Sequence, residues 1–168
     1  ASTGALSVNM EPVDAAVILD QVVGEFRDKL EARGLSIVVN AQQPPVMILA
    51  DGRHLWRVMD NLMGNIAKYA QTDTRVYIDM KREGGWVQMT FRNISREQLN
   101  ISSQELMERF VRGDSSRNTE GHGLGLNIAQ SLTKLMGGNL HIEIDGDLFK
   151  VKLFFREYRE AEKTMDEQ

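Results

Sequence analysis

The sequence predicts a two-layer α/β sandwich in which about three helices cover one face of a mixed sheet. Three observations support this fold class. Three stretches show the apolar periodicity of helices, and about seven short runs have the composition of strands. Strands and helices do not alternate regularly, which argues against a wholly parallel sheet, and two predicted hairpins stand late in the chain.

Apolar stripes predict the three helices. The first helix covers residues 14–33, where every fourth position is apolar and Gly34 can end the helix. Its stripe is Ile18, Val22, Phe26 and Leu30. The second helix runs from about residue 52 to residue 70, and its stripe is Leu55, Met59, Leu62 and Ile66. The third helix covers residues 124–136 and is stopped by the glycines at 137 and 138.

Alternating or continuous apolar runs predict the strands. The first short strand is expected around Leu6, Val8 and Met10. Further strands are predicted at residues 35–40, 46–50, 75–82, 86–93, 139–144 and 148–155. We expect residues 1–10 to hold a cloning scar or linker end with this first strand, residues 11–155 to form the domain, and residues 156–168 to be a charged tail.

The composition narrows the classes of function. The chain has 168 residues, 42% of them hydrophobic, and a net charge of −4 without a basic block, so neither nucleic acid nor anionic lipid is an expected partner. No cysteine is present, which excludes disulfides, zinc ribbons and thiol catalysis and suits a reducing compartment. Because no apolar run approaches the ~18 residues of a membrane span, we expect this polypeptide to be soluble.

Four polar residues share one face of the second predicted helix. Asn61, Asn65, Lys68 and Tyr69 fall within about 100° of arc, so all four side chains can face one cavity. A carboxamide oxygen suits Mg²⁺, a lysine suits a phosphate, and a tyrosine offers a flat face and a hydroxyl to a base. Each also has an ordinary structural explanation: solvated polar residues on a surface helix, and a half-buried tyrosine in the core.

A glycine run precedes the third predicted helix, in "EGHGLGLNIAQ" at residues 120–130. Glycines let backbone N–H groups approach an anion, and a helix N-terminus adds unpaired donors, so phosphate is the natural guest. A flexible lead-in to the helix explains such a run equally simply. No Lys-Ser/Thr pair follows it, and no strand enters it directly, so neither the P-loop nor the dinucleotide fingerprint fits.

Three ordered segments together resemble the N box, the F box and the second glycine box of sensor histidine kinases. They are "NLMGNIAKYA" at 61–70, "ELMERFVRGD" at 105–114 and "EGHGLGLNIAQSL" at 120–132. The resemblance extends from about residue 11 to residue 155. It implies the Bergerat-type ATP-binding fold, shared with DNA gyrase B, MutL and the anti-sigma-factor kinases, in which ATP lies under a mobile lid.

The N-box resemblance assigns roles to the helical face. Asn65 is similar to the asparagine that ligates Mg²⁺, and Asn61 to its companion toward the phosphates. Lys68 resembles the lysine that meets the phosphates, and Tyr69 the ring beside the adenine. The expected cofactors are therefore ATP and Mg²⁺, with Asn65 as the metal ligand.

The other two boxes supply the lid and the phosphate cradle. Phe110 resembles the F-box aromatic at the root of the lid, and Arg109 and Arg112 are candidate cations for the phosphates. The expected lid covers residues 111–122. The remaining expected ATP contacts lie in the second glycine box, where Gly123 and Leu124 would offer backbone N–H groups; the full set is Gly121, His122, Gly123, Leu124, Gly125 and Leu126.

The sequence departs from the family at two points. The first glycine box, Asp-x-Gly-x-Gly, is missing: Asn93 stands at the expected adenine-binding Asp and Ser95 at the first glycine. We expect Asn93 to contact adenine through its carbonyl oxygen, the alternative being an ordinary turn residue at a strand end. The other departure is that none of His54, His122 and His141 lies in a phosphoacceptor motif.

The resemblance therefore implies the ATP-binding catalytic domain of a two-component sensor histidine kinase. Asn65, Lys68 and Arg112 would assist transfer of the γ-phosphoryl group to a histidine on a dimerisation domain absent from this chain, with a response regulator as the further partner. A pseudokinase-type regulatory module and an anti-sigma-factor serine kinase are the alternatives. We expect a cytoplasmic, monomeric domain from a membrane-bound, homodimeric kinase.

Overall fold

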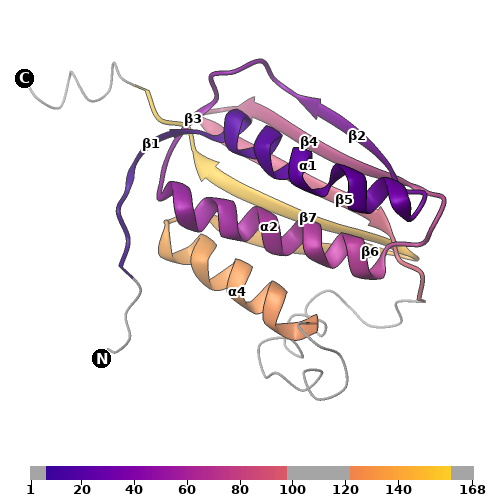
Figure 1. The fold of residues 1–168 in the computed structure, drawn as a ribbon. Coiled ribbons are helices and arrows are strands. Elements are labelled where there is room, and N and C mark those ends of the chain that lie inside the picture. Colours follow the sequence, from indigo (N-terminus) through magenta and orange to yellow (C-terminus); the bar gives the residue numbers. More distant parts are fainter. Residues whose placement is uncertain (1–6, 98–121, 160–168) are drawn as a thin grey trace, which may run out of the picture.

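The structure is a computed structural model that describes residues 7–97 and 122–159. Three helices lie on one face of a five-stranded sheet within these residues (Figure 1), so the predicted two-layer sandwich is confirmed. The helices are α1 (Ala15–Ala32), α2 (Gly52–Tyr69) and α4 (His122–Leu135).

The sheet is mixed, as the sequence predicts. Its strand order is β2-β4-β5-β7-β6, in which β2 pairs with β4 in parallel and every other pair is antiparallel. The strands are β2 (Ser36–Ala41), β4 (Arg75–Glu83), β5 (Trp86–Ile94), β6 (Asn139–Asp145) and β7 (Leu148–Arg156). A separate antiparallel pair joins β1 (Glu11–Asp14) to β3 (Met47–Ala50).

Aspartates begin the first two helices. Asp14 accepts hydrogen bonds from the backbone N–H groups at the start of α1, and Asp51 does the same for Arg53 and His54 in α2. A carboxylate at this position pairs otherwise unsatisfied donors and complements the positive end of the helix. These caps set where each helix starts on the sheet.

The predicted apolar stripes face the core, although not all of their members are fully buried. All four residues of the α2 stripe are buried, whereas in α1 only Val22 and Leu30 are fully buried and Ile18 and Phe26 lie at the edge of the core. Alternate residues of β4, β5 and β7 face the helices, among them Ile78, Phe91 and Phe155. The apolar face of the sheet and the three helical stripes therefore form one core.

Two predicted boundaries were wrong. Leu6 lies outside the described residues, and residues 7–10 form no strand. Asn9 N–H instead donates to Asp51, the N-cap of α2, and Ser7 O bonds His54; strand β1 begins at Glu11, where β3 offers a partner. Helix α4 begins at His122, two residues before the prediction, so Gly123 is helical rather than part of a lead-in.

The start of the predicted charged tail remains attached to the sandwich. Strand β7 includes Arg156, and the backbone N–H groups of Glu157 and Tyr158 donate to the carbonyls of Gly85 and Met47. No helix in the described ranges is long and apolar enough to span a bilayer.

Candidate functional site

The predicted site residues that the structure describes lie toward one end of the sandwich. Helices α1 and α2 and strand β5 finish at this end, and α4 begins beside the C-terminal half of α2 (Figure 1). The predicted lid, at residues 111–122, lies outside the described residues except for His122. The structure therefore brings the N box and the second glycine box to one place.

Helix α2 presents the four N-box side chains. Asn61 and Asn65 are half-buried one turn apart, Lys68 is exposed, and Tyr69 is half-buried as the last residue of the helix. Their spacing on one helix gives them the shared face that the sequence predicts. Both amide side chains are thus held by the helix at the border of the core.

Asn65 and Gly125 are in close contact across two helices. A Cβ atom built on Gly125 would stand 3.2 Å from Oδ1 and 3.4 Å from Nδ2 of Asn65. Any larger residue at position 125 would displace this amide by a few tenths of an ångström. The glycine therefore allows close packing against the N-box asparagine, whereas its backbone is ordinary helix.

Asn61 has an unsatisfied donor. Its Nδ2 atom is buried and has no hydrogen-bond partner within the described part of the chain. Buried polar atoms are almost always paired, so an orphan amide donor one turn from Asn65 marks a place where a ligand acceptor would be favourable.

The end of β5 is fastened to the end of α2. Gln71 N–H donates to Ile94 O over 2.7 Å, and Arg96 N–H donates to Tyr69 O over 3.0 Å. The Arg96 guanidinium lies over the Tyr69 ring, 5.7 Å from its centroid. Burial raises the pKa of the Tyr69 hydroxyl, partly offset by the Arg96 charge, so this hydroxyl stays protonated and can donate a hydrogen bond.

Asn93 lies at the end of β5, close to this junction. It is 4% exposed and pairs with Phe149 of β7 in the sheet register, one residue before the strand ends at Ile94. Ser95, at the expected first glycine, forms a bridge with Ala70 and donates its N–H to Asp147 O. The segment without the glycine box is thus an ordered backbone junction between α2, β5 and the β6–β7 turn.

The second glycine box is only partly described. His122, Gly123 and Leu124 form the first turn of α4, where helical N–H groups lack intrahelical acceptors. Leu126 is 2% exposed and belongs to the core, and as the fifth residue of α4 its N–H lies beyond the unpaired first turn, so the structure does not favour it as an ATP contact. Four predicted site residues lie outside the described residues: Arg109, Phe110, Arg112 and Gly121.

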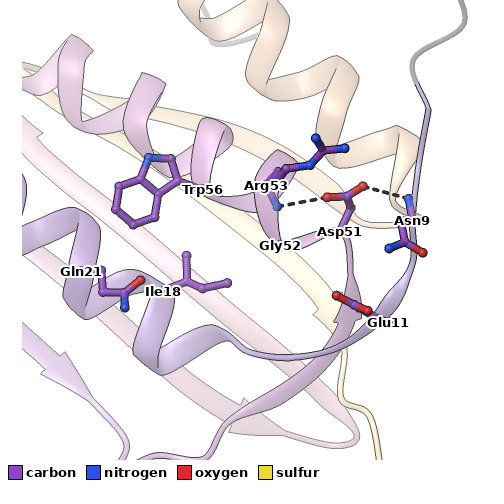
Figure 2. A pocket seen from close by; sticks show the side chains of 8 residues that line it. All are labelled: Asn9, Glu11, Ile18, Gln21, Asp51, Gly52, Arg53 and Trp56. Atoms are coloured by element: carbon purple, nitrogen blue, oxygen red, sulfur yellow. Dashed lines mark hydrogen bonds between the residues drawn. The ribbon is translucent and has the colours of Figure 1, made fainter.

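A separate hollow lies at the opposite end of α2. It measures about 620 Å³ and Figure 2 shows its lining, which includes Trp56, Ile18 and the buried Asp51. Asp51 accepts N–H bonds from Asn9 and Arg53 there. None of the predicted ATP contacts lines this hollow.

Sequence reasoning missed two residues at the site. The side chain of Arg33 reaches the C-terminus of α2, and Arg96 lies over Tyr69. Arg33 is 34 residues from its first partner, and no periodicity or motif connects positions so far apart. Only the side-by-side placement of α1 and α2 brings them together.

Comparison with known proteins shows which family this chain is similar to. Residues 50–159 match the family model described as histidine kinase-, DNA gyrase B- and HSP90-like ATPase. Probable sensor protein PcoS of Escherichia coli is 33% identical over 154 residues, which cover 89% of this chain and 32% of PcoS. The signal transduction histidine-protein kinase BaeS of Escherichia coli strain K12 is 28% identical over 139 residues, 82% of this chain and 30% of BaeS.

A solved structure supports the fold independently. The mycobacterial sensor histidine kinase MprB has a TM-score of 0.72 and 22% identity, and the match covers 89% of this chain and 98% of the MprB chain. The chain spans about a third of the length of PcoS and BaeS, its curated relatives. The family model matches most of the chain, and the chain therefore belongs to the histidine kinase-, DNA gyrase B- and HSP90-like ATPase family.

Proposed function

We propose that this chain is the ATP-binding catalytic domain of a two-component sensor histidine kinase, with the domain at residues 11–155. Its family implies ATP binding, and its relatives are named as sensor proteins and histidine kinases. The observation that supports the site most strongly is the contact between Gly125 and Asn65, because it joins two sequence boxes that are 60 positions apart (125 − 65).

The side chains around Asn65 fit a Mg²⁺ ion that is bound together with a triphosphate. Mg²⁺ keeps several waters and takes further ligands from substrate phosphates, so a single amide oxygen from the protein is sufficient. Among the described residues no group of three His, Asp or Glu side chains could hold a metal by itself. The Oδ1 atom of Asn65 would be the protein ligand, and the bound ion would neutralise charge on the phosphates.

The remaining contacts divide between the two ends of the nucleotide. Asn61 Nδ2, Lys68 and the first backbone N–H groups of α4, at His122, Gly123 and Leu124, would bind phosphate oxygens. Tyr69 and Asn93 would contact the adenine, where the end of α2 meets the end of β5. The predicted roles of Arg109, Phe110, Arg112 and Gly121 remain part of the proposal.

The chemistry of Asn61 favours phosphoryl transfer over hydrolysis. By resemblance, Asn61 stands where ATPase members carry a glutamate that orients water, and a carboxamide cannot accept a proton at neutral pH. The chain's own contribution would be positioning and charge neutralisation, with the nucleophile arriving from outside. We propose that this nucleophile is a histidine on a dimerisation domain and that a response regulator then receives the phosphoryl group.

Two of the chain's own histidines are engaged elsewhere. The Nε2 atom of His54 lies 2.8 Å from Ser7 O at the N-terminal end of α2, and His141 on β6 stacks edge-to-face on Phe154. Neither lies at the end of the sandwich that holds Asn65. This placement supports an acceptor supplied by another domain. We propose that both domains belong to the cytoplasmic part of a membrane-bound, homodimeric kinase.

Calorimetry with a non-hydrolysable ATP analogue tests the site. We expect Mg²⁺-dependent binding that Asn65→Ala weakens by about tenfold or more. Asn139→Ala, which removes an exposed asparagine at the start of β6, should leave the affinity unchanged. Tight binding by Asn65→Ala at the wild-type affinity would contradict the assignment.

A second candidate, a pseudokinase-type module, is favoured by the missing first glycine box at Asn93 and Ser95. Mixing the chain and ATP with a dimerisation domain that carries the acceptor histidine distinguishes the two. Acid-labile phosphohistidine on that domain supports the kinase, whereas ATP binding without transfer supports the regulatory module. Phosphoserine on a partner protein would instead indicate the anti-sigma-factor type of kinase.

A further inference from the structure

We infer that Arg33 is a positioning residue for the nucleotide site and acts through the C-terminus of α2; this inference rests on the proposed function. Its guanidinium donates Nη1 to Ala67 O and Nη2 to Ala70 O, the second bond being 2.7 Å long. One arginine of α1 thus binds two carbonyls around the last turn of α2. Lys68 and Tyr69, the proposed phosphate and adenine contacts, lie between those two carbonyls in the sequence.

Helix α2 ends without a glycine cap. Ala70 at its C-cap has φ −71° and ψ 145°, an extended conformation, so the chain leaves the helix at once. The last four carbonyls of a helix have no intrahelical partner, and a left-handed glycine commonly helps to pair them. Here external donors do so: Arg33 pairs Ala67 O, and the Arg96 N–H pairs Tyr69 O.

The position of Arg33 is fixed by how α1 ends. Arg33 is the C-cap of α1, and its N–H donates to Leu30 O. Gly34 follows with φ +74°, and a Cβ there would clash with Oδ1 of Asp73. The end of α1 therefore lies close to the loop that follows α2, and this closeness together with the positive φ favours glycine at the turn. The guanidinium is therefore directed at α2 by local structure.

The charge of Arg33 suits the place that it occupies. A helix C-terminus carries a partial negative charge, which a cation complements. A planar guanidinium also binds two carbonyls at once, whereas a lysine is a single point charge. Without this clamp the last turn of α2 would fray, and Lys68 and Tyr69 would lose their fixed direction although Arg33 itself touches no nucleotide.

Binding measurements on matched variants test this role. Arg33→Met keeps an apolar stem and removes the donors, and we expect it to weaken the Mg²⁺-ATP analogue by about tenfold. Arg33→Lys should recover part of the loss, since one ammonium can still reach one carbonyl. Arg27→Met, which removes an exposed arginine from the same helix, should bind as the wild type does.

A substitution in the core distinguishes loss of the positioning role of Arg33 from a general loss of stability. Val87 is a buried residue at the start of β5, the opposite end of that strand from Asn93. Val87→Ala should lower Tm but should leave the affinity unchanged at temperatures well below the melting transition. Hydrogen exchange of the Ala70 and Gln71 amides should accelerate in Arg33→Met and not in Val87→Ala. Wild-type affinity or unchanged exchange in Arg33→Met would overturn the inference.

The same measurements distinguish failure of the proposed function from failure of the positioning role of Arg33. If the wild-type chain binds no nucleotide, the proposed function fails, and with it the role of Arg33 toward a nucleotide. If the wild type binds and Arg33→Met lowers Tm without lowering affinity, as expected of Val87→Ala, the proposed function stands and the positioning role is overturned.

Discussion

Gly125 of α4 lies directly against Asn65 of α2, with 3.2 Å between its projected Cβ and the amide Oδ1. The contact joins the proposed metal ligand to the helix whose first turn would bind phosphate. Gly125 is an ordinary helical residue, so this glycine serves close packing, and no turn requires it.

Gly125→Ala should weaken binding of the Mg²⁺-ATP analogue while leaving the fold as stable as before or more so. Alanine favours a helix over glycine by about 1 kcal/mol, but its methyl group would displace Asn65 by a few tenths of an ångström. Paired calorimetry and urea unfolding should therefore show lower affinity, by about fivefold or more, without lower stability.

Gly24→Ala is the matched control for this prediction. A Cβ on Gly24 in α1 would meet nothing within 4 Å, so the substitution adds helix propensity and no displacement. It should raise stability and leave nucleotide affinity unchanged. Wild-type affinity in Gly125→Ala would show that the contact with Asn65 does not constrain the site.

Asn93→Asp should sharpen the preference for ATP over inosine triphosphate. An asparagine amide can accept from the 6-amino group of adenine or, turned over, donate to the 6-oxo group of hypoxanthine. A carboxylate only accepts, and its charge-assisted hydrogen bond is about twice as strong. Competition binding with both nucleotides should show the ATP preference increasing by about tenfold.

Thr90→Ser is a suitable control for that comparison, since Thr90 is a buried polar residue on the same strand but faces the opposite side of the sheet. It should leave the ratio of the two affinities unchanged. An equal ratio in the wild type and in Asn93→Asp would place the 6-position of the base away from Asn93.

Asp51→Asn should lower the free energy of unfolding at neutral pH. It should also make this free energy depend less on pH in the acidic range. The pKa of the Asp51 carboxyl lies below its usual 3.8, and the hydrogen bond from the Asn9 N–H is the largest cause. The N–H groups of His54 and Arg53 and the charge of the His54 ring lower this pKa further, whereas burial raises it. A depressed folded-state pKa stabilises the fold above the unfolded-state value, and this stability is lost as the pH falls through the folded-state value. Loss of the charged cap should cost about 1 kcal/mol at pH 7.

Urea unfolding at a series of pH values measures this difference directly. The gap between wild type and Asp51→Asn should be largest at neutral pH and should close as the pH falls below 3.8. Asp28→Asn, at an exposed position of α1, should show no such gap. A gap that stays constant down to strongly acidic pH would mean that the charge of Asp51 contributes nothing.

The local features of the chain could be predicted from sequence because they depend on neighbouring residues. The apolar stripe of α2 and the hairpin of β4 and β5 repeat with the period of their own secondary structure, and both were confirmed. The shared face of Asn61 and Asn65 also follows from one helix. Family membership followed from three boxes in order, a pattern that is likewise written along the chain.

The errors occurred where distant residues compete for the same backbone. Residues 7–10 alternate like a strand, but Asp51 and His54, more than 40 positions away, bind Asn9 and Ser7 instead. The glycine run at the start of α4 was open to two interpretations, a lead-in and an anion cradle. Neither included the close packing that Gly125 requires.

By itself, then, the sequence determined the helices, the hairpins, the family and the face that carries Asn61 and Asn65. Only the tertiary structure decided that Arg33 holds the end of α2, that Gly125 lies against Asn65, and that Ser95 pairs with Ala70 where a glycine box was expected. The physical reason is range: periodicity and capping act within a few residues, whereas these contacts depend on how whole helices and strands pack side by side.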